Sequence, residues 1–123
     1  MTLPAIIQTY LDAYNRKDVD ALVACVADTV VFENVSNAGH SMKIEGRSAF
    51  AELARQAATI FTTRHQTVRT AVVDGEHVAL EIDWIGTPAV DLGPMRAGEQ
   101  VVMRGASFFT IAGGKLTRIV DLS

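Results

Sequence analysis

One carboxylate near the end of the chain stands where it could carry out acid/base chemistry. The closing segment TRIVDLS (117–123) is a short apolar strand in which Ile119 and Asp121 share one face, while Val120 and Leu122 share the other. A carboxyl group on an apolar face is desolvated, which raises its pKa toward neutral pH and lets it exchange protons with a ligand. Two alternatives remain open: this face lines a pocket, or the strand end is frayed and Asp121 is an ordinary solvated carboxylate.

Other polar side chains fall on predicted buried faces, where they could assist such a reaction. Tyr10 and Tyr14 lie on the apolar stripe of a predicted helix, and their hydroxyls could reach either a ligand or a backbone partner in the core. Asn34 shares a strand face with Phe32, so its amide is a candidate ligand contact; the alternative is a bond to its own backbone. His40 lies in a polar loop over the expected pocket mouth, where an imidazole could shuttle protons or simply be solvated.

Hydrophobic periodicity predicts the elements that must position these residues. Apolar residues recur at helical spacing in three stretches, and alternating β-branched stretches dominate the second half of the chain. We expect helices over residues 3–14, 19–26 and 48–60, and strands over residues 29–35, 65–73, 77–86, 99–112 and 115–123. The segment 36–46 is expected to be a polar loop, and Asp74-Gly75 a hairpin turn. The order predicts an α+β domain, with a curved antiparallel sheet wrapped over three helices.

Alternation in residues 77–86 separates two faces of one predicted strand. The apolar members are expected to face inward, where they would line a cavity or pack in the core: Val78, Leu80, Ile82 and Trp84. Glu81 and Asp83 are expected to face outward, where Arg69 on the neighbouring strand could pair with them.

Composition limits the class of protein. The chain has 123 residues, of which 49% are hydrophobic and 20% charged, so a single folded domain over residues 1–123 is expected. The net charge of −3 and the scattered basic residues argue against a nucleic-acid partner. No apolar run is long enough for a membrane span, and no signal peptide is evident. Cys25 is the only cysteine, which excludes an internal disulfide and favours a cytoplasmic location.

Three segments carry a resemblance to a known family: IIQTYLDAYNRKDVDALVACVADTVVFENV, IEGRSAFAEL and FFTIAGGKLTRIVD. They are similar to the nuclear transport factor 2-like (NTF2-like) superfamily, and most similar to its branch of SnoaL-like polyketide cyclases and ketosteroid isomerases. The resemblance implies a cone-shaped fold, in which three helices from the N-terminal half pack on a curved, mostly antiparallel sheet that encloses one pocket. It also implies a homodimer formed through the outer face of the sheet.

The resemblance places some site residues and removes others. Tyr10 corresponds to the tyrosine that donates to the substrate oxyanion in the isomerases, Asn34 to their aspartate base and Ala106 to their protonated aspartic acid. An amide cannot take a proton from carbon and an alanine cannot donate a hydrogen bond, so steroid isomerase chemistry is not expected. If Ala106 faces the pocket, strand alternation implies that Arg104 and Phe108 do so too.

The last-strand aspartate of the cyclases resembles Asp121, which would then be the acid/base residue. Limonene-epoxide hydrolases also use a last-strand aspartate, with an asparagine similar to Asn34 that orients water. Their additional arginine–aspartate pair has no match at Leu80 or Ile82, so their full mechanism is not expected.

Two functions from different classes are therefore carried forward. The first is a cofactor-independent isomerase, cyclase or hydrolase that acts on a small apolar, oxygen-bearing molecule. Its catalytic residues would be Asp121, Arg104, Asn34 and Tyr10, and its substrate would contact Trp84, Phe32, Ile82, Phe108, His40 and Tyr14. The second is a non-catalytic ligand-binding or dimerisation domain, with Asp121 and Arg104 as a structural ion pair. No metal site is expected, because the three histidines form no ligand pair. An open, sizeable cavity is needed for the enzyme; a cavity plugged by side chains would exclude it, and a filled but openable one would favour binding.

Overall fold

The computed structural model describes residues 2–37 and 39–123. Over these residues, three helices and six strands follow one another in the order α1, α2, β1, β2, α3, β3, β4, β5, β6. Their bounds are α1 Ala5–Arg16, α2 Val19–Ala24, β1 Val26–Val35, β2 Met42–Glu45, α3 Arg47–Ile60, β3 Phe61–Asp74, β4 His77–Pro88, β5 Val101–Ala112 and β6 Lys115–Leu122. None of these helices is long and apolar enough to cross a membrane.

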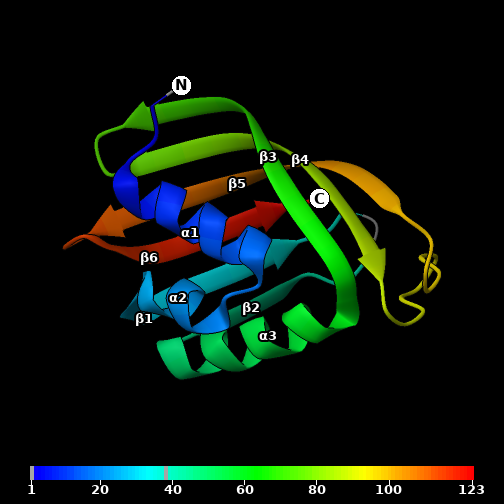
Figure 1. Ribbon diagram of the computed structural model, residues 1–123. Coiled ribbons are helices and arrows are strands. Elements are labelled where there is room, and N and C mark those ends of the chain that lie inside the picture. The colour runs from blue at the N-terminus through cyan, green and yellow to red at the C-terminus, as the bar shows by residue number, and fades with distance from the viewer. Residues whose placement is uncertain (1, 38) are drawn as a thin grey trace.

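The six strands form one curved, unclosed sheet in the order β2-β1-β6-β5-β4-β3. Only β1 and β6 run parallel; every other neighbouring pair is antiparallel. Figure 1 shows the helices on one face of the sheet, with α1 across its middle strands and α3 near the β2 edge. The three-helix, mostly antiparallel α+β architecture expected from the sequence is confirmed, and its concave face is the one that the helices cover.

The helices bury the faces that their periodicity predicts. Ile7, Tyr10 and Leu11 of α1 are buried against the sheet. Lys17 adopts a left-handed conformation (φ 57°) and ends α1, and the Asp18 side chain then accepts a hydrogen bond from Ala21 N and caps α2, as expected. This tight junction fixes how α1 lies over the strands.

The predicted polar loop over residues 36–46 is only partly correct. Met42–Glu45 form the short edge strand β2, which pairs antiparallel with Val31–Asn34 of β1. Three of its four side chains are exposed, so no hydrophobic alternation marks it in the sequence. The boundaries of β1 and β3 also lie three and four residues earlier than expected, at Val26 and Phe61.

Register across the sheet places four residues in one row on the concave face. Asn34 of β1 pairs with Asp121 of β6, Asp121 pairs with Ser107 of β5, and Ser107 pairs with Leu80 of β4. Directly paired residues point to the same face, so the inward face of β5 carries Ser107 and Phe109. The expectation that Arg104 and Phe108 face inward is wrong by one residue, which turns the strand over.

Arg104 instead joins a charged cluster on the outer, convex face. Its Nε lies 3.5 Å from Asp83 Oδ1, and its Nη1 lies 3.8 Å from Glu81 Oε2. Arg69 of β3 lies 2.8 Å from Asp83 Oδ2, which confirms the predicted pairing of Arg69 with these acids. The expected ion pair between Arg104 and Asp121 therefore does not form, because the two side chains lie on opposite faces.

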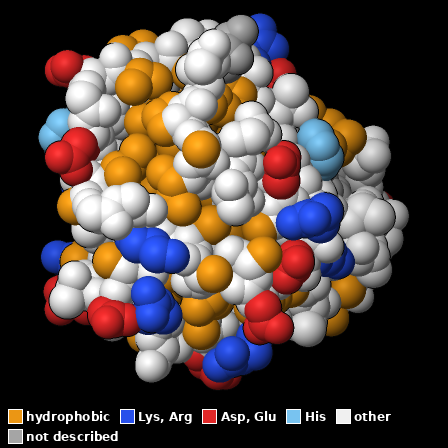
Figure 2. Space-filling model, turned by 60° about the vertical axis from the view of Figure 1, so that its left-hand side comes forward, with side chains coloured by type: hydrophobic (Ala, Val, Ile, Leu, Met, Phe, Trp, Pro, Cys, Tyr) orange, Lys and Arg blue, Asp and Glu red, His pale blue; other side chains and the backbone are white. Residues whose placement is uncertain are grey.

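Large apolar side chains are exposed beside this cluster. Phe108 is 39% exposed and Val102 is 71% exposed, and both lie on the outer face of β5. Seen from the left-hand side of Figure 1, the surface carries a region of gathered hydrophobic side chains with charged side chains around it (Figure 2). Exposed apolar area of this kind is typical of an interaction surface.

Candidate functional site

Asp121 of β6 is held by a hydrogen bond on the concave face. Ser107 Oγ of β5 donates to Asp121 Oδ1 over 2.7 Å, a short distance that is typical of a bond to an ionised acceptor. The second carboxylate oxygen, Oδ2, has no hydrogen bond from any residue in the described part of the chain. No enclosed side-chain nitrogen or oxygen in these ranges lacks a partner, so Oδ2 must reach accessible space.

The surroundings of this carboxyl raise its pKa. Desolvation is the main cause and brings the pKa of Asp121 from 3.8 to about 6, although the bond from Ser107 lowers it in part. Asp121 is partly buried and keeps some exposed surface. A carboxyl with this pKa is mostly ionised at pH 7 and can accept and return a proton near neutral pH.

Two tyrosine hydroxyls of α1 lie near Asp121. Tyr10 is 6% exposed, and its ring packs edge-to-face on Phe109 with centroids 5.5 Å apart. Burial raises the pKa of Tyr10 well above 10, and the charge of Asp121 raises it further. The Tyr10 hydroxyl, like Oδ2 of Asp121, has no hydrogen bond within residues 2–37 and 39–123. It therefore keeps its proton and has it available for a ligand oxygen.

Tyr14, one helical turn further along α1, is tied to Trp84. The indole Nε1 of Trp84 donates to the Tyr14 hydroxyl over 2.9 Å, and Phe61 packs edge-to-face on the indole with centroids 5.0 Å apart. Gly86 makes room for the indole, because a Cβ atom at this position would lie 2.4 Å from Trp84 Cη2. Trp84 thus lies on the inward row of β4, as its alternation predicts.

Arg64 of β3 is a site residue that sequence reasoning missed. It is 6% exposed, its guanidinium carbon lies 3.9 Å from the centre of the Tyr14 ring, and its Nε donates to the Tyr14 carbonyl over 3.4 Å. It precedes the strand expected over residues 65–73, and an arginine in a strand is most often a surface residue. No pattern in the sequence singles it out.

The remaining expected contacts are divided between the core, the edge of the site and the surface. Phe32 and Ile82 are buried, and Phe32 packs edge-to-face on Phe50 with centroids 5.8 Å apart. Asn34 is partly buried beside Asp121, and none of the described residues bonds its side chain. His40 is an exposed loop residue.

Arg104 and Phe108 do not belong to this constellation, because both lie on the outer face. Ser107 takes the inward place on β5 that was expected for Ala106. In this register Arg104 lies directly opposite Asp83, which strand alternation also predicts to face outward. Opposite charges in a directly opposed cross-strand pair are stabilising.

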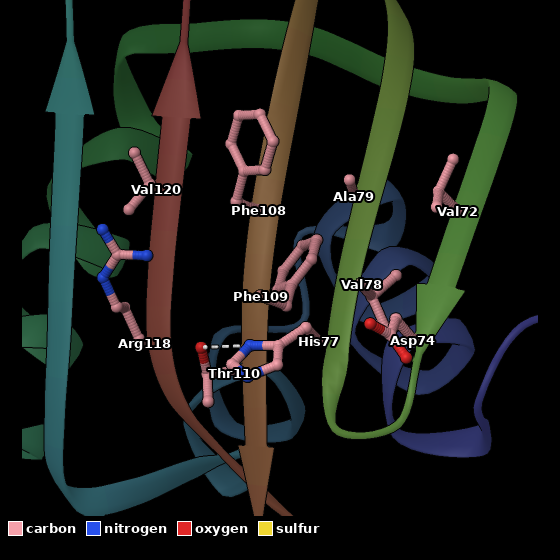
Figure 3. Close-up of a pocket in the computed structure, with 10 residues that line it drawn as sticks. All are labelled: Val72, Asp74, His77, Val78, Ala79, Phe108, Phe109, Thr110, Arg118 and Val120. Atoms are coloured by element: carbon pink, nitrogen blue, oxygen red, sulfur yellow. Dashed lines mark hydrogen bonds between the residues drawn. The ribbon is translucent and has the colours of Figure 1, made fainter.

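Three hollows in the described part of the surface lie away from Asp121. One hollow of about 270 Å³ lies on the outer face, where Figure 3 shows Phe108 between Val120 of β6 and Ala79 of β4. That volume is below the range usual for ligand pockets. Two further hollows lie beside α1 and His65. None of these three hollows is lined by Asp121.

The described residues offer no ready metal site. Nowhere in them do three or more His, Cys, Asp or Glu side chains come together closely enough to hold a metal ion. The constellation on the concave face consists of one carboxyl, one guanidinium, two phenols, a hydroxyl, an amide and an indole. These groups can bind an oxygen-bearing molecule and move a proton.

Comparisons with known proteins agree with this fold. A family model described as "SnoaL-like domain" matches residues 7–119. Among solved structures, a proposed polyketide cyclase from Xanthomonas campestris pv. campestris is 29% identical, with a TM-score of 0.75 over 96% of this chain and 87% of that one. A proposed polyketide cyclase from Pseudomonas putida is 25% identical, with a TM-score of 0.76 over 98% of this chain and 90% of that one.

More distant structures share the fold alone. An LEH-like epoxide hydrolase from M. tuberculosis is 23% identical, with a TM-score of 0.75 over 95% of this chain and 78% of that one. Among proteins with curated descriptions, none matches this chain.

Proposed function

The chain belongs to the SnoaL-like domain family, and from this premise we propose that it is a small enzyme that moves a proton on an apolar, oxygen-bearing molecule with the Asp121 carboxyl. One observation carries the proposal: a desolvated carboxyl on the concave face has one oxygen held by Ser107 and the other unbonded within the described residues. Such a group is oriented for proton transfer and is not neutralised by a cation.

The charge state of Asp121 suits the role of a base. With a pKa of about 6, about 90% of the carboxyl is ionised at pH 7, and its proton affinity is about 100-fold above that of an ordinary aspartate. We propose that Oδ2 takes a proton from a carbon next to a carbonyl group. The electron pair of the broken C–H bond then becomes the oxyanion of an enolate, and Asp121 later returns the proton.

Donors for that oxyanion are the Tyr10 hydroxyl and the Asn34 amide. The Tyr10 hydroxyl lies close enough for the charge of Asp121 to raise its pKa, and Asn34 pairs with Asp121 across the β1–β6 ladder. A donor aimed at developing charge in a site of low dielectric typically contributes a few kcal/mol to a transition state. Trp84, Ile82 and Phe32 would supply the apolar contacts.

A second function is favoured by the position of the surface hollows. None of the three hollows described above is lined by Asp121, whereas an enzyme must admit substrate to its reacting group at every turnover. The hydrogen bond from Ser107 would hold the Asp121 carboxyl equally well in a protein that performs no reaction. The second candidate is therefore a small-molecule-binding domain that performs no reaction.

Hydrogen–deuterium exchange separates these functions without knowledge of the substrate. The protein is incubated in D₂O with 2-tetralone, an apolar ketone with acidic C–H groups, and loss of its α-proton signal is followed by NMR. The enzyme proposal predicts exchange above buffer that Asp121→Asn abolishes and that Asp20→Asn, a change at an exposed position on α2, leaves intact. Binding of the ketone without accelerated exchange favours the binding domain. A parallel incubation with styrene oxide tests water addition instead.

We further propose that the outer face of the sheet joins two copies of this chain. Exposed Val102 and Phe108 lie there beside the Arg69, Glu81 and Asp83 cluster, which combines apolar area with complementary charge. Sedimentation velocity at micromolar concentration should give a dimer, and the double change Val102→Lys with Phe108→Lys should give a monomer. A monomeric unmodified protein contradicts this proposal.

A further inference from the structure

Arg64 is a buried cation without an anionic partner. Its side chain belongs to β3 and is 6% exposed. In residues 2–37 and 39–123, no carboxylate oxygen lies within 4.0 Å of its guanidinium, although Arg16, Arg47, Arg55, Arg69 and Arg104 each have such a partner. Charged groups removed from water are normally paired with an opposite charge. Arg64 therefore departs from the pattern of the other arginines at the position where pairing matters most.

The contacts of Arg64 satisfy only part of its guanidinium. Its Nε donates to the Tyr14 carbonyl over 3.4 Å, and its carbon lies 3.9 Å above the Tyr14 ring. These contacts use the ring face and the negative end of the α1 helix. The two Nη groups have no acceptor among the described residues. Because no enclosed polar side-chain atom there lacks a partner, the Nη groups reach accessible space.

Arg64 lies on β3 and Asp121 on β6, two strands that β4 and β5 separate, and both charges act on the two tyrosines of α1. The charge of Asp121 raises the pKa of both Tyr10 and Tyr14, and the charge of Arg64 lowers the pKa of both. No described contact joins Arg64 to Asp121 directly. The concave face thus carries a cation on β3, a proton-accepting carboxyl on β6 and, on the intervening strand β4, the Trp84 indole bonded to the Tyr14 hydroxyl.

We propose that the two Nη groups of Arg64 bind the carboxylate of an apolar acid, whose reacting carbon then lies toward Asp121. The planar fork of a guanidinium matches the two oxygens of a carboxylate, and such paired hydrogen bonds are about twice as strong as neutral ones. This inference rests on the proposed function in placing the ligand in the same site, and it narrows the substrate class to apolar carboxylic acids. Binding at Arg64 does not itself require turnover.

The test compares two ligands that differ only in charge. Affinities for 4-phenylbutyrate and for its neutral amide, 4-phenylbutanamide, are measured by calorimetry on the unmodified protein, Arg64→Gln and Arg55→Gln. Arg55 is an exposed arginine on α3 and serves as the matched control. The unmodified protein and Arg55→Gln should bind the carboxylate at least about tenfold more tightly than the amide. Arg64→Gln should lose this preference and keep its affinity for the amide.

Equal affinities for the two ligands in the unmodified protein would overturn the proposal, as would a preference that survives in Arg64→Gln. If Arg64→Gln does not fold, the Nε–Hε signal of Arg64 in ¹⁵N-arginine-labelled unmodified protein decides. The carboxylate must shift this signal and the amide must not. An unmoved signal at saturating carboxylate refutes the inference.

The same ligand pair, measured on Asp121→Asn, separates this inference from the proposed function. Asp121→Asn should keep the preference for the carboxylate while it loses proton exchange with 2-tetralone. If the unmodified protein prefers the carboxylate to the amide but does not accelerate proton exchange, the proposed enzyme function is refuted and the Arg64 site stands. If it accelerates proton exchange but binds the carboxylate and the amide equally, the Arg64 site alone is refuted.

Discussion

Replacing Asp121 with asparagine should stabilise the protein above neutral pH. Asparagine has the shape of aspartate and its Oδ1 still accepts from Ser107, but it cannot ionise. The pKa of Asp121 is about 6 in the folded protein against 3.8 in a solvated chain. A folded-state pKa raised in this way means that the contribution of Asp121 to stability is fully present below about pH 3.8 and is lost as pH rises through about 6. At pH 8 the loss is about 3 kcal/mol.

Urea unfolding at pH 3, 4.5, 6 and 8 measures this effect, with Trp84, the only tryptophan, as the fluorescent reporter. Asp121→Asn and the unmodified protein should have similar free energies of unfolding at pH 3, and the variant should be more stable by about 1 kcal/mol at pH 4.5 and by up to about 3 kcal/mol at pH 8. Asp20→Asn controls for the loss of one charge. A difference that stays constant from pH 3 to 8, or a variant that is less stable at pH 8, would contradict a desolvated Asp121 carboxyl.

Three other substitutions test the site and its register. Ser107→Ala removes a bond that favours the ionised carboxylate, so NMR titration should show the pKa of Asp121 raised further, by about one unit; an unchanged or lower value contradicts the bond. Gly86→Ala places a Cβ atom 2.4 Å from Trp84 Cη2, so it should destabilise the protein by about 1–3 kcal/mol and shift the tryptophan emission; an unchanged spectrum contradicts this packing. Arg104→Ala removes an exposed partner of Asp83 on the outer face, so thermal unfolding should show a loss of unfolding free energy below about 1 kcal/mol. A changed pKa of Asp121 in this variant would indicate instead that Arg104 lies on the concave face.

The secondary structure of the chain is largely readable because its periods are clear. The apolar stripe of α1, the cap at Asp18 and the alternation from Val78 to Trp84 each have one interpretation, and the structure confirms them. The strand β2 was missed because it is an edge strand whose side chains are mostly exposed. Its pairing with β1 comes from backbone hydrogen bonds, which leave no mark on residue type.

The register of β5 could not be read with the same ease. Both alternations of VVMRGASFF contain apolar residues, since Met103 and Phe109 lie on one face and Val102 and Phe108 on the other. The resemblance to the isomerases predicted that Ala106 faces inward, and strand alternation then predicted the same for Arg104. Burial of Ser107 and Phe109 decides the opposite. Charge pairing across the sheet favours the observed register. A buried, unpaired Arg104 would destabilise the protein, whereas an exposed Arg104 opposite Asp83 does not.

The position of Asp121 on the inner face was correctly predicted, but the position of Arg64 was not. Asp121 lies in a strand whose alternation is fixed by Ile119, which is fully buried. Arg64 lies near the start of β3, which follows α3 directly and begins earlier than its β-branched pattern suggests. Its burial depends on Tyr14, 50 residues away in the sequence. Such tertiary contacts are outside the reach of local patterns.

The pKa of the Asp121 carboxyl is the measurement that tests the central claim most directly. The protein is labelled with ¹³C at its aspartate carboxyl carbons, and the chemical shifts are followed from pH 3 to pH 9, with Asp121→Asn to assign the signal. The account predicts a pKa of about 6, the value of a desolvated carboxyl available for proton transfer. A value at or below about 3.9 would show a solvated or ion-paired aspartate and would contradict the role proposed for Asp121.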